Sequence, residues 1–314
     1  MPHSETNGLR APEAIMRESG FEVSSRCSSR PSCFDYAARK EETILLIKIQ
    51  SDIDNFSQVD SNELMSISNH ISASALLISE KTREKPLEDD TVYSRYNIIA
   101  ITSKTFENII LRGMHPLIQA GPGGYYVEID YAAVKRRRQE LGLSVGEMAE
   151  MIGASRRTLY GYERGMTKAS VMSAYNLIRA LGVPIAKPVN IFEKPKNQNK
   201  HFVGKVRNNA IKNKFLKKIF RKFASYNVTA IKKAPFDFLV NVPEEEMRIV
   251  GGVANDKERS LDRRVEEIIS VSKVVKAHPV LITNGQKPLD KDISCVPKEE
   301  LSKIRNPEDL ICKF

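Results

Sequence analysis

The stretch that decides the fold is Leu143–Gly165, which reads LSVGEMAEMIGASRRTLYGYERG. Ser144 can cap a helix, and Glu147, three residues later, completes a capping box. Gly153 then supplies a turn, because a left-handed backbone costs glycine little. Ser155 can cap the helix that follows. The stretch therefore predicts two short helices joined by a tight turn.

Each of these helices shows apolar side chains at helical spacing, which predicts a buried face. The side chains expected to be buried are Met148, Ala149, Ile152, Leu159 and Tyr162. The polar side chains of the second helix are expected to face outward; they are Arg156, Arg157, Tyr160 and Arg164. One exposed edge, beginning at residue 155, is thus both basic and aromatic.

This stretch resembles the helix-turn-helix of the phage lambda repressor and Cro family, and Tyr162–Gly165 is typical of that family's exit from the recognition helix. The resemblance extends over residues 131–189 and implies a lambda repressor-like domain of five helices. The implied first, fourth and fifth helices are Tyr131–Leu141, Ser170–Leu181 and a short segment after Gly182-Val183-Pro184.

The resemblance implies that the second helix enters the major groove of double-stranded DNA with its N-terminal residues on base edges. By position, Arg156 and Arg157 would read bases, and an arginine can donate two hydrogen bonds to guanine. We therefore expect guanines in each half-site, with a plain phosphate contact as the alternative for each arginine. The other positions that the resemblance implies for DNA binding are Ser144, Ser155, Thr158, Tyr160 and Arg164.

Two residues depart from the family pattern. Val145 stands where many relatives have a phosphate-binding glutamine, and Gly161 stands where a long polar reader is usual. Fewer direct contacts are expected, so the affinity would depend more on the cluster Lys135–Arg138 of the first helix. In this cluster Arg136 and Arg137 are the candidate contacts to the phosphate backbone, and a solvated helix face is the alternative.

The charge of the chain is unevenly distributed. The 314 residues carry a net charge of +10, with −6 in residues 1–130, +6 in 131–189 and +10 in 190–314. A polyanion should therefore meet the middle and C-terminal parts. No apolar run approaches the roughly 20 residues of a membrane-spanning helix, and no signal peptide is evident, so we expect a cytoplasmic protein without membrane partners.

The four cysteines predict no metal site. They have neither CxxC spacing nor nearby histidines, and we expect reduced thiols. No cofactor is expected. The cysteines are Cys27, Cys33, Cys295 and Cys312.

The pattern predicts three domains: an α/β domain in residues 1–124, the helix-turn-helix domain in 131–189, and a basic helix plus a second α/β domain in 200–314. The segment Gly121–Gly124, Gly-Pro-Gly-Gly, is expected to break regular structure and mark a boundary. In the first domain we expect helices at Ala11–Ser19, Glu63–Ile71 and Thr105–Leu111 and strands at Phe34–Ala38, Ile44–Ile49, Ala75–Ile78 and Ile98–Ile101.

The third domain repeats the pattern of the first. Phe34-Asp35-Tyr36 corresponds to Phe236-Asp237-Phe238, and each is followed by an apolar strand and then a helix. Later pairs are Ser74–Ile78 with His278–Ile282 and Phe106–Ile109 with Leu301–Ile304. Two copies of one fold are expected on either side of the middle domain, with chance similarity of short strands as the alternative.

Each copy resembles restriction-endonuclease-like folds, whose sites need an aspartate and then a carboxylate-x-lysine on the next strand to hold a metal ion. Asp35 and Lys48 fit, but Leu46 stands in place of the carboxylate. The second copy keeps Asp237 without the acid or the lysine. The resemblance thus implies inactive domains and no enzyme. Alternatively, Asp35 is a buried turn or capping residue without such ancestry.

A basic segment precedes the second copy. Residues 194–236 contain 13 Lys/Arg and no acidic residue. Ile211, Phe215, Ile219 and Phe223 predict one apolar stripe on a helix whose other face is basic. That face could follow DNA phosphates; a solvated face, RNA or a membrane surface are the alternatives.

Over nearly its whole length, the chain is similar to archaeal HTH-type transcriptional regulatory proteins. The resemblance implies a transcription regulator, which we expect to bind paired half-sites as a homodimer through its flanking blocks. The sequence names no small-molecule effector. Three rivals remain: a coactivator bridging factor that binds protein, a metal-dependent nuclease and an antitoxin-like partner protein.

Overall fold

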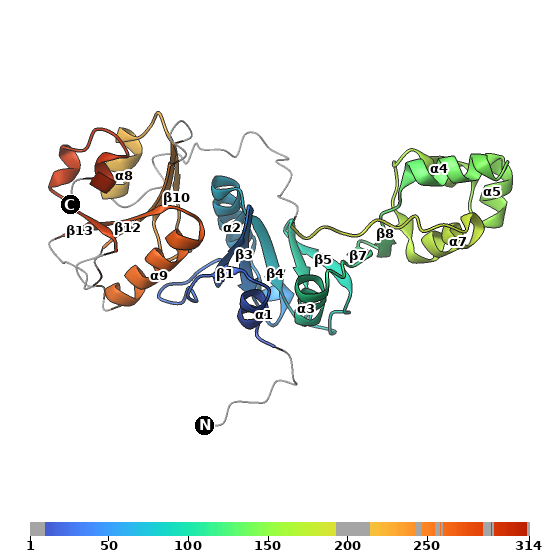
Figure 1. Cartoon of the computed structure of the whole chain (residues 1–314), viewed down its shortest axis with the longest axis horizontal. Coiled ribbons are helices and arrows are strands. Elements are labelled where there is room, and N and C mark those ends of the chain that lie inside the picture. The colour runs from blue at the N-terminus through green and yellow to red at the C-terminus, as the bar shows by residue number, and fades with distance from the viewer. Residues whose placement is uncertain are drawn as a thin grey trace, which may run out of the picture.

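The computed structural model describes residues 10–192, 214–242, 247–254, 258, 260–284, 290 and 292–312. Ile211 and the side chain of Cys312, about which the sequence made predictions, lie outside this part of the chain. Figure 1 shows an N-terminal α/β unit in the middle, a C-terminal α/β unit at one end and a helical domain at the other.

The N-terminal unit begins a sheet of nine strands in the order β1-β2-β3-β4-β6-β5-β7-β8-β9. Strand β3 pairs antiparallel with β2 and parallel with β4, and β4 pairs parallel with β6. The strands of this unit are β1 (Glu22–Val23), β2 (Tyr36–Lys40), β3 (Thr43–Ile49), β4 (Ser74–Ile78), β5 (Thr91–Arg95), β6 (Ile98–Ile101), β7 (Ile118–Gly121) and β8 (Gly124–Val127).

Helices cover both faces of this sheet. Those expected from the sequence are present as α1 (Pro12–Glu18), α2 (Gln58–Ile71) and α3 (Ser103–Arg112), and a short 3-10 helix, η1 (Ile53–Asn55), precedes α2. Helix α2 begins five residues earlier than expected because Ser57 caps it by accepting a hydrogen bond from the Asp60 amide. The first predicted strand begins two residues late, at Tyr36. Strands β1, β5, β7 and β8 were not predicted.

The Gly-Pro-Gly-Gly segment is the turn of the β7–β8 hairpin. Gly123 and Gly124 have φ of +84° and +145°, which a side chain would disfavour. Strand β7 pairs with β5 of the N-terminal unit, and β8 pairs with β9 (Ala169–Ser170) of the helical domain. The sequence predicted a break in regular structure here, but Gly121 and Gly124 belong to strands, and the segment lies inside a hairpin that connects the two parts. The domain limits drawn from the sequence stay predictions.

The helical domain contains α4 (Tyr131–Glu140), α5 (Val145–Met151), α6 (Arg156–Glu163) and α7 (Val171–Leu181). The fifth helix expected after Gly182 is absent from residues 182–192, so that prediction is wrong. The chain there is extended, because Ile185 accepts a backbone hydrogen bond from Asp130 and Ala186 forms a β-bridge with Ile129. Pro184 and Pro188 also lack the amide hydrogen that a helix needs.

The C-terminal unit has a five-stranded sheet in the order β10-β11-β12-β13-β14. Helix α8 (Lys214–Lys222) lies on one face and α9 (Leu261–Val274) on the other; the described part of the unit also contains a 3-10 helix, η4 (Glu300–Ser302), and α10 (Asp309–Cys312). The strands are β10 (Asn227–Ala230), β11 (Phe238–Val242), β12 (Met247–Val253), β13 (His278–Thr283) and β14 (Ser294–Pro297).

The two α/β units repeat one arrangement, as the sequence predicts. Strands β11 and β12 are antiparallel while β12, β13 and β14 are parallel, as in β2, β3, β4 and β6. The aspartates occupy equivalent places: Ile49 donates its amide hydrogen to Asp35 Oδ2 at 2.8 Å, and Val253 to Asp237 Oδ2 at 2.7 Å. The last predicted pair, Phe106–Ile109 with Leu301–Ile304, differs in structure: the first copy has α3 there and the second has η4.

The two units pack against each other through the faces that carry α2 and α9. One buried cluster draws side chains from both, and the rings of Phe34 and Phe236 lie 6.3 Å apart. Ion pairs cross the boundary from Arg30 to Asp237 (2.9 Å) and from Lys233 to Asp60 (2.7 Å). The α/β units thus form a paired block inside one chain.

Two cysteines lie buried near this boundary. Burial raises the pKa of the Cys27 and Cys33 thiols well above their ordinary value, so both stay protonated. The described residues contain no cluster of three or more histidine, cysteine or acidic side chains that could hold a metal ion.

Candidate nucleic-acid interface

Helices α5 and α6 begin at serine caps. Ser144 Oγ accepts a hydrogen bond from the Glu147 amide (3.2 Å), and Glu147 Oε2 accepts one from the Ser144 amide (2.8 Å). The second bond lowers the pKa of the Glu147 carboxyl. Ser155 Oγ accepts from the Thr158 amide at 3.0 Å, and Gly153 between the helices has φ of +67°. The predicted capping box, turn and second cap are confirmed.

The five side chains expected inside this domain form its core. Met148, Ala149, Ile152, Leu159 and Tyr162 are all buried. They pack with Val134 of α4 and with Ala174 and Leu177 of α7. Apolar contacts therefore fix the inner face of α6. The side chains that do not take part in this core form the outer face of the helix.

A buried ion pair joins α4 to α6. Arg138 donates from Nε and Nη2 to the two carboxylate oxygens of Glu163 at 2.5 and 3.0 Å, and from Nη1 to the Leu143 carbonyl at 2.7 Å. The hydrogen bonds that Arg138 donates to Glu163 raise the pKa of Arg138 above its ordinary value. The pair ties the end of α6 to the first helix of the domain.

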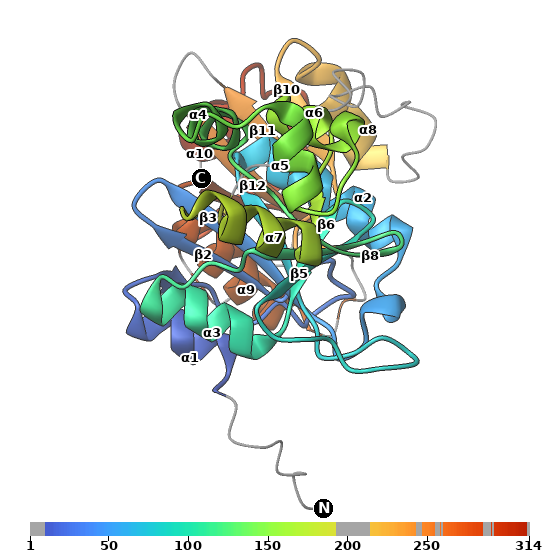
Figure 2. The ribbon, with the colours of Figure 1, turned by 90° about the vertical axis from the view of Figure 1, so that its right-hand side faces the viewer.

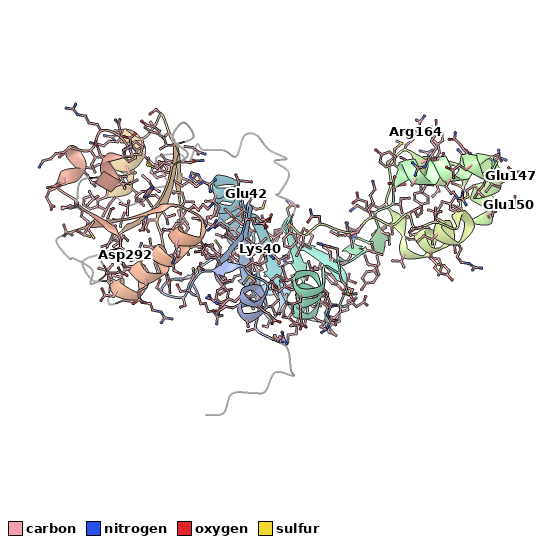
Figure 3. The ribbon with its side chains drawn as sticks, in the orientation of Figure 1. Lys40, Glu42, Glu147, Glu150, Arg164 and Asp292 are labelled. Atoms are coloured by element: carbon pink, nitrogen blue, oxygen red, sulfur yellow. The ribbon has the colours of Figure 1, made fainter. Side chains whose placement is uncertain are left out.

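The outer face of α6 carries the predicted polar residues. Arg156, Arg157, Tyr160 and Arg164 are exposed, and the Arg164 guanidinium lies 4.0 Å from the centre of the Tyr160 ring. Figure 3 shows Arg164 at the upper edge of the helical domain. Thr158 is half-buried because its hydroxyl turns back to Ser155 (2.8 Å).

Gly146, which the sequence analysis missed, brings α5 and α6 together at this face. A methyl group added at Gly146 would lie 3.0 Å from Nη2 of Arg156. The Arg156 guanidinium therefore packs over the first turn of α5, beside the cap residue Ser144. The glycine two residues after a predicted cap was the only sequence signal for this close approach.

The basic cluster on α4 divides into two groups. Arg138 is buried in its ion pair, so the prediction that the whole cluster faces the backbone is wrong for this residue. Arg137 is half-buried and donates to the Leu181 carbonyl (3.1 Å) and to Glu140 (3.0 Å). Lys135 and Arg136 are therefore the cations of α4 that face solvent, and Arg136 Nε lies 4.0 Å from Glu140 Oε1 in an exposed pair.

The aspartates of the α/β units are each held by cations. Asp35 Oδ2 lies 3.4 Å from Lys48 Nζ, and Asp35 Oδ1 lies 3.7 Å from Arg26. In the second copy Asp237 lies 2.5 Å from Arg264 of α9 and 2.9 Å from Arg30 of the other unit. Arg264 thus supplies the charge that Lys48 supplies in the first copy.

Family comparisons match two parts of the chain. Residues 7–116 match a PD-(D/E)XK superfamily domain, and residues 134–187 match a Helix-turn-helix domain of the Cro/C1 type. The first match spans the N-terminal α/β unit from α1 to α3, and the second begins within α4 and extends past the end of α7. The fold therefore combines a nuclease-like α/β unit with a DNA-binding type of helical domain.

Archaeal relatives match nearly the whole chain under the name "Putative HTH-type transcriptional regulatory protein". The relative from Methanosarcina acetivorans is 31% identical, with 95% of this chain and 92% of the relative covered. Those from Pyrococcus furiosus and Methanocaldococcus jannaschii are 30% and 32% identical, with 95% and 89% of this chain and 94% and 87% of the relatives covered. The chain belongs to this family of archaeal HTH-type transcriptional regulatory proteins.

The superfamily of the N-terminal unit implies a divalent metal ion, but the residues present do not fit one. Leu46, fully buried in an apolar cluster, stands where the second carboxylate would be, and Asp35 is already paired with cations. At the equivalent positions of the second copy, the side chains of Val250 and Gly252 offer no ligand atom. A hard cation needs several oxygen ligands, which neither position supplies.

In the described part of the chain, no helix is both long enough and apolar enough to cross a bilayer.

Proposed function

We propose that this regulator binds double-stranded DNA in a sequence-specific manner, with α6 in the major groove. The observation that carries the proposal is the division of α6 into a locked inner face and a basic outer face. Leu159, Tyr162 and the Glu163–Arg138 pair fix the helix, and its first turn presents Arg156 and Arg157 to solvent. A recognition helix reads base edges from this end.

Arg156 and Arg157 are the residues that we assign to base reading. The contact of Arg156 with Gly146 orients its guanidinium before DNA arrives, which reduces the entropy lost on binding. A bidentate bond to guanine O6 and N7 is worth about 1 to 3 kcal/mol of discrimination. Guanines are therefore expected in each half-site.

The remaining interface residues would position the domain on phosphates. Side-chain donors to phosphate oxygens fix orientation without reading sequence. We assign this role to Ser144, Ser155, Thr158, Tyr160, Arg164 and Arg136, with Arg137 supporting α4 from behind through its bond to Leu181.

Selection of bound sequences from a random duplex library with the full chain tests this function. We expect one enriched motif containing guanine, with protection of its major-groove edge. A folded protein that enriches no sequence over random competitor at moderate salt would overturn the proposal. A protein-bridging coactivator would give this result while retaining a protein partner, and so would an antitoxin-like protein.

A metal-dependent nuclease is the alternative that the N-terminal family match raises. We propose that both α/β units are restriction-endonuclease-like folds without catalysis, because each lacks the carboxylate at the position of Leu46. Incubation of supercoiled plasmid with the full chain and Mg²⁺ or Mn²⁺ should leave it intact. Nicked plasmid that disappears in the Asp35→Ala variant would establish an enzyme.

A homodimer on paired half-sites is also part of this proposal, because helix-turn-helix domains commonly bind half-sites one helical turn apart. The α2 and α9 faces pack on each other within one chain, so the two chains of the homodimer would meet through other surfaces. Light scattering of the protein with and without its DNA site measures this; one chain per duplex would contradict it.

A further inference from the structure

The outer side of α8 carries only positive charge among its described side chains. Lys217, Lys218 and Arg221 are exposed, and none of them forms an ion pair with another described residue. Apolar residues hold the opposite side of the helix in the core beneath the second sheet. These residues are Leu216, Ile219 and Phe223, of which Leu216 was not foreseen.

Lys222 anchors the end of this helix. Its Nζ donates to the carbonyl oxygens of Ser302 (2.9 Å) and Ile304, which holds α8 against the turn that follows η4. Two exposed cations of that turn, Lys303 and Arg305, extend the positive surface. Two acidic residues lie beside them: Glu300 is 4.0 Å from Lys303 in an exposed pair that offsets little charge, and Asp309 Oδ2 accepts the backbone amide hydrogen of Arg305 at 2.7 Å. We call Lys217, Lys218, Arg221, Lys303 and Arg305 the α8 face.

The internal repeat shows that the fold does not need this charge. Helix α1 occupies the place in the first copy that α8 occupies in the second: it precedes the edge strand and covers the equivalent face of its sheet. On α1, however, Arg17 pairs with Glu13 at 3.1 Å and Glu18 pairs with Arg10 at 2.6 Å. One structural role is filled by a neutralised helix in the first copy and by an unpaired cationic helix in the second. A polyanionic ligand of the second copy would account for that difference.

The position of α8 favours duplex DNA as that ligand. Figure 1 places α8 and the helical domain at opposite ends of the molecule, both on its upper edge. Figure 2, which looks along the long axis, places α6 in front of α8 on the same edge. A duplex is a long, regular row of phosphates that can follow such an edge. An unstructured RNA or an acidic protein could bind to α8 without α6 and α8 lying along the same edge.

We propose that the α8 face binds the phosphate backbone of the DNA whose bases α6 reads, as a second and sequence-independent contact. The inference rests on the proposed function, because both contacts use one duplex. The α8 face then adds affinity only when the duplex extends beyond the site covered by the helix-turn-helix. It also makes that affinity steeply dependent on salt, because each neutralised phosphate releases counterions.

The experiment compares duplex lengths with the full chain. Binding is measured by fluorescence anisotropy on a short duplex containing only the selected site and on one extended at both ends, over a range of salt. The wild type should bind the extended duplex more tightly. The variant K217A/K218A/R221A should lose this gain, and the slope of log K against log salt should flatten by about 2 to 3, at roughly 0.9 per phosphate contact. Its affinity for the short duplex should match the wild type.

The control variant R83A/K85A/K273A removes the same charge from exposed positions outside the α8 face and should keep the length gain. Equal thermal unfolding of the variants excludes loss of fold. An unchanged gain and slope in K217A/K218A/R221A, an equal loss in the control, or an α8-dependent preference for single-stranded RNA would each overturn the inference. In these cases specific binding to the short duplex persists; its absence in the wild type would instead overturn the proposed function.

Discussion

Arg138 on α4 and Glu163 on α6 form a two-point ion pair inside the helical domain, with both side chains buried. Removing one partner of such a pair leaves a buried charge without compensation, at a cost of about 3 to 5 kcal/mol. We expect Arg138→Met to lower the free energy of unfolding of this domain by about that amount. Denaturant unfolding monitored by amide NMR signals of α6 measures the change.

The matched control for this pair is the double variant R138M/E163L, which removes both charges. Because two apolar side chains of similar volume can replace a buried pair at little cost, most of the stability should return. If R138M alone unfolds at the same denaturant concentration as the wild type, the pair does not hold α6 in place.

Arg156 and Arg157 should differ from Arg136 in what they contribute to binding. Arg156→Ala or Arg157→Ala should cost about 1 to 3 kcal/mol on the selected site and broaden base preference at one position. Arg136→Ala should weaken binding to all sequences alike, since a phosphate contact carries no base information. Competition assays with single-base variants of the site separate these outcomes. Identical profiles for the three variants would contradict this division of roles.

Gly146→Ala should weaken DNA binding without weakening the fold. Alanine favours a helix over glycine by about 0.5 to 1 kcal/mol, but its methyl group would lie 3.0 Å from Arg156 Nη2 and push the guanidinium away. We expect a higher melting temperature together with a higher Kd. In an Arg156→Ala background the same substitution should leave the Kd unchanged. A loss of affinity that persists in that background would show that Gly146 acts by another route.

His70 should make the pairing of the α/β units sensitive to acid. It lies buried at their boundary, where Nδ1 meets Thr229 Oγ1 at 3.1 Å, and burial, reinforced by the nearby charge of Arg248, lowers its pKa to about 4. The unfolded chain, with an ordinary pKa of 6.5, binds the proton first. Stability is therefore complete above pH 6.5 and falls toward pH 4, by at most about 3 kcal/mol.

Unfolding measured between pH 4 and 7 tests this dependence. The variant His70→Gln cannot titrate, so its stability should vary less over this range than that of the wild type. Equal slopes for the two proteins would assign the acid sensitivity to other groups.

Local chemistry decided how much the sequence could predict. The capping box at Ser144, the turn at Gly153 and the apolar spacing of α5 and α6 depend on neighbours within a few residues, and all are confirmed. Arg138 was placed with the exposed cations because its partner, Glu163, lies 25 residues further along the chain. Spacing within α4 alone carries no information about that pair.

Contacts between distant segments were the main source of error. The resemblance to lambda repressor predicted a fifth helix, but the Ile129–Ala186 bridge keeps the chain extended there. The repeat in the α/β units was visible in short strand patterns, whereas their packing was not. Bonds such as that between Arg30 and Asp237 join residues 207 positions apart, and no local pattern indicates them.

The hairpin at Gly121–Gly124 also determines how the DNA-reading domain can be excised. A fragment cut at residue 131 would lose the partner strand of Ala169–Ser170 and leave its main-chain groups bare, a template for aggregation. A fragment that starts ahead of Ile118 would keep β8 paired with Ala169–Ser170 and would expose instead the edge of β7, which pairs with β5 at two positions in the whole chain. The smallest independently folding DNA-binding fragment therefore includes part of the neighbouring sheet.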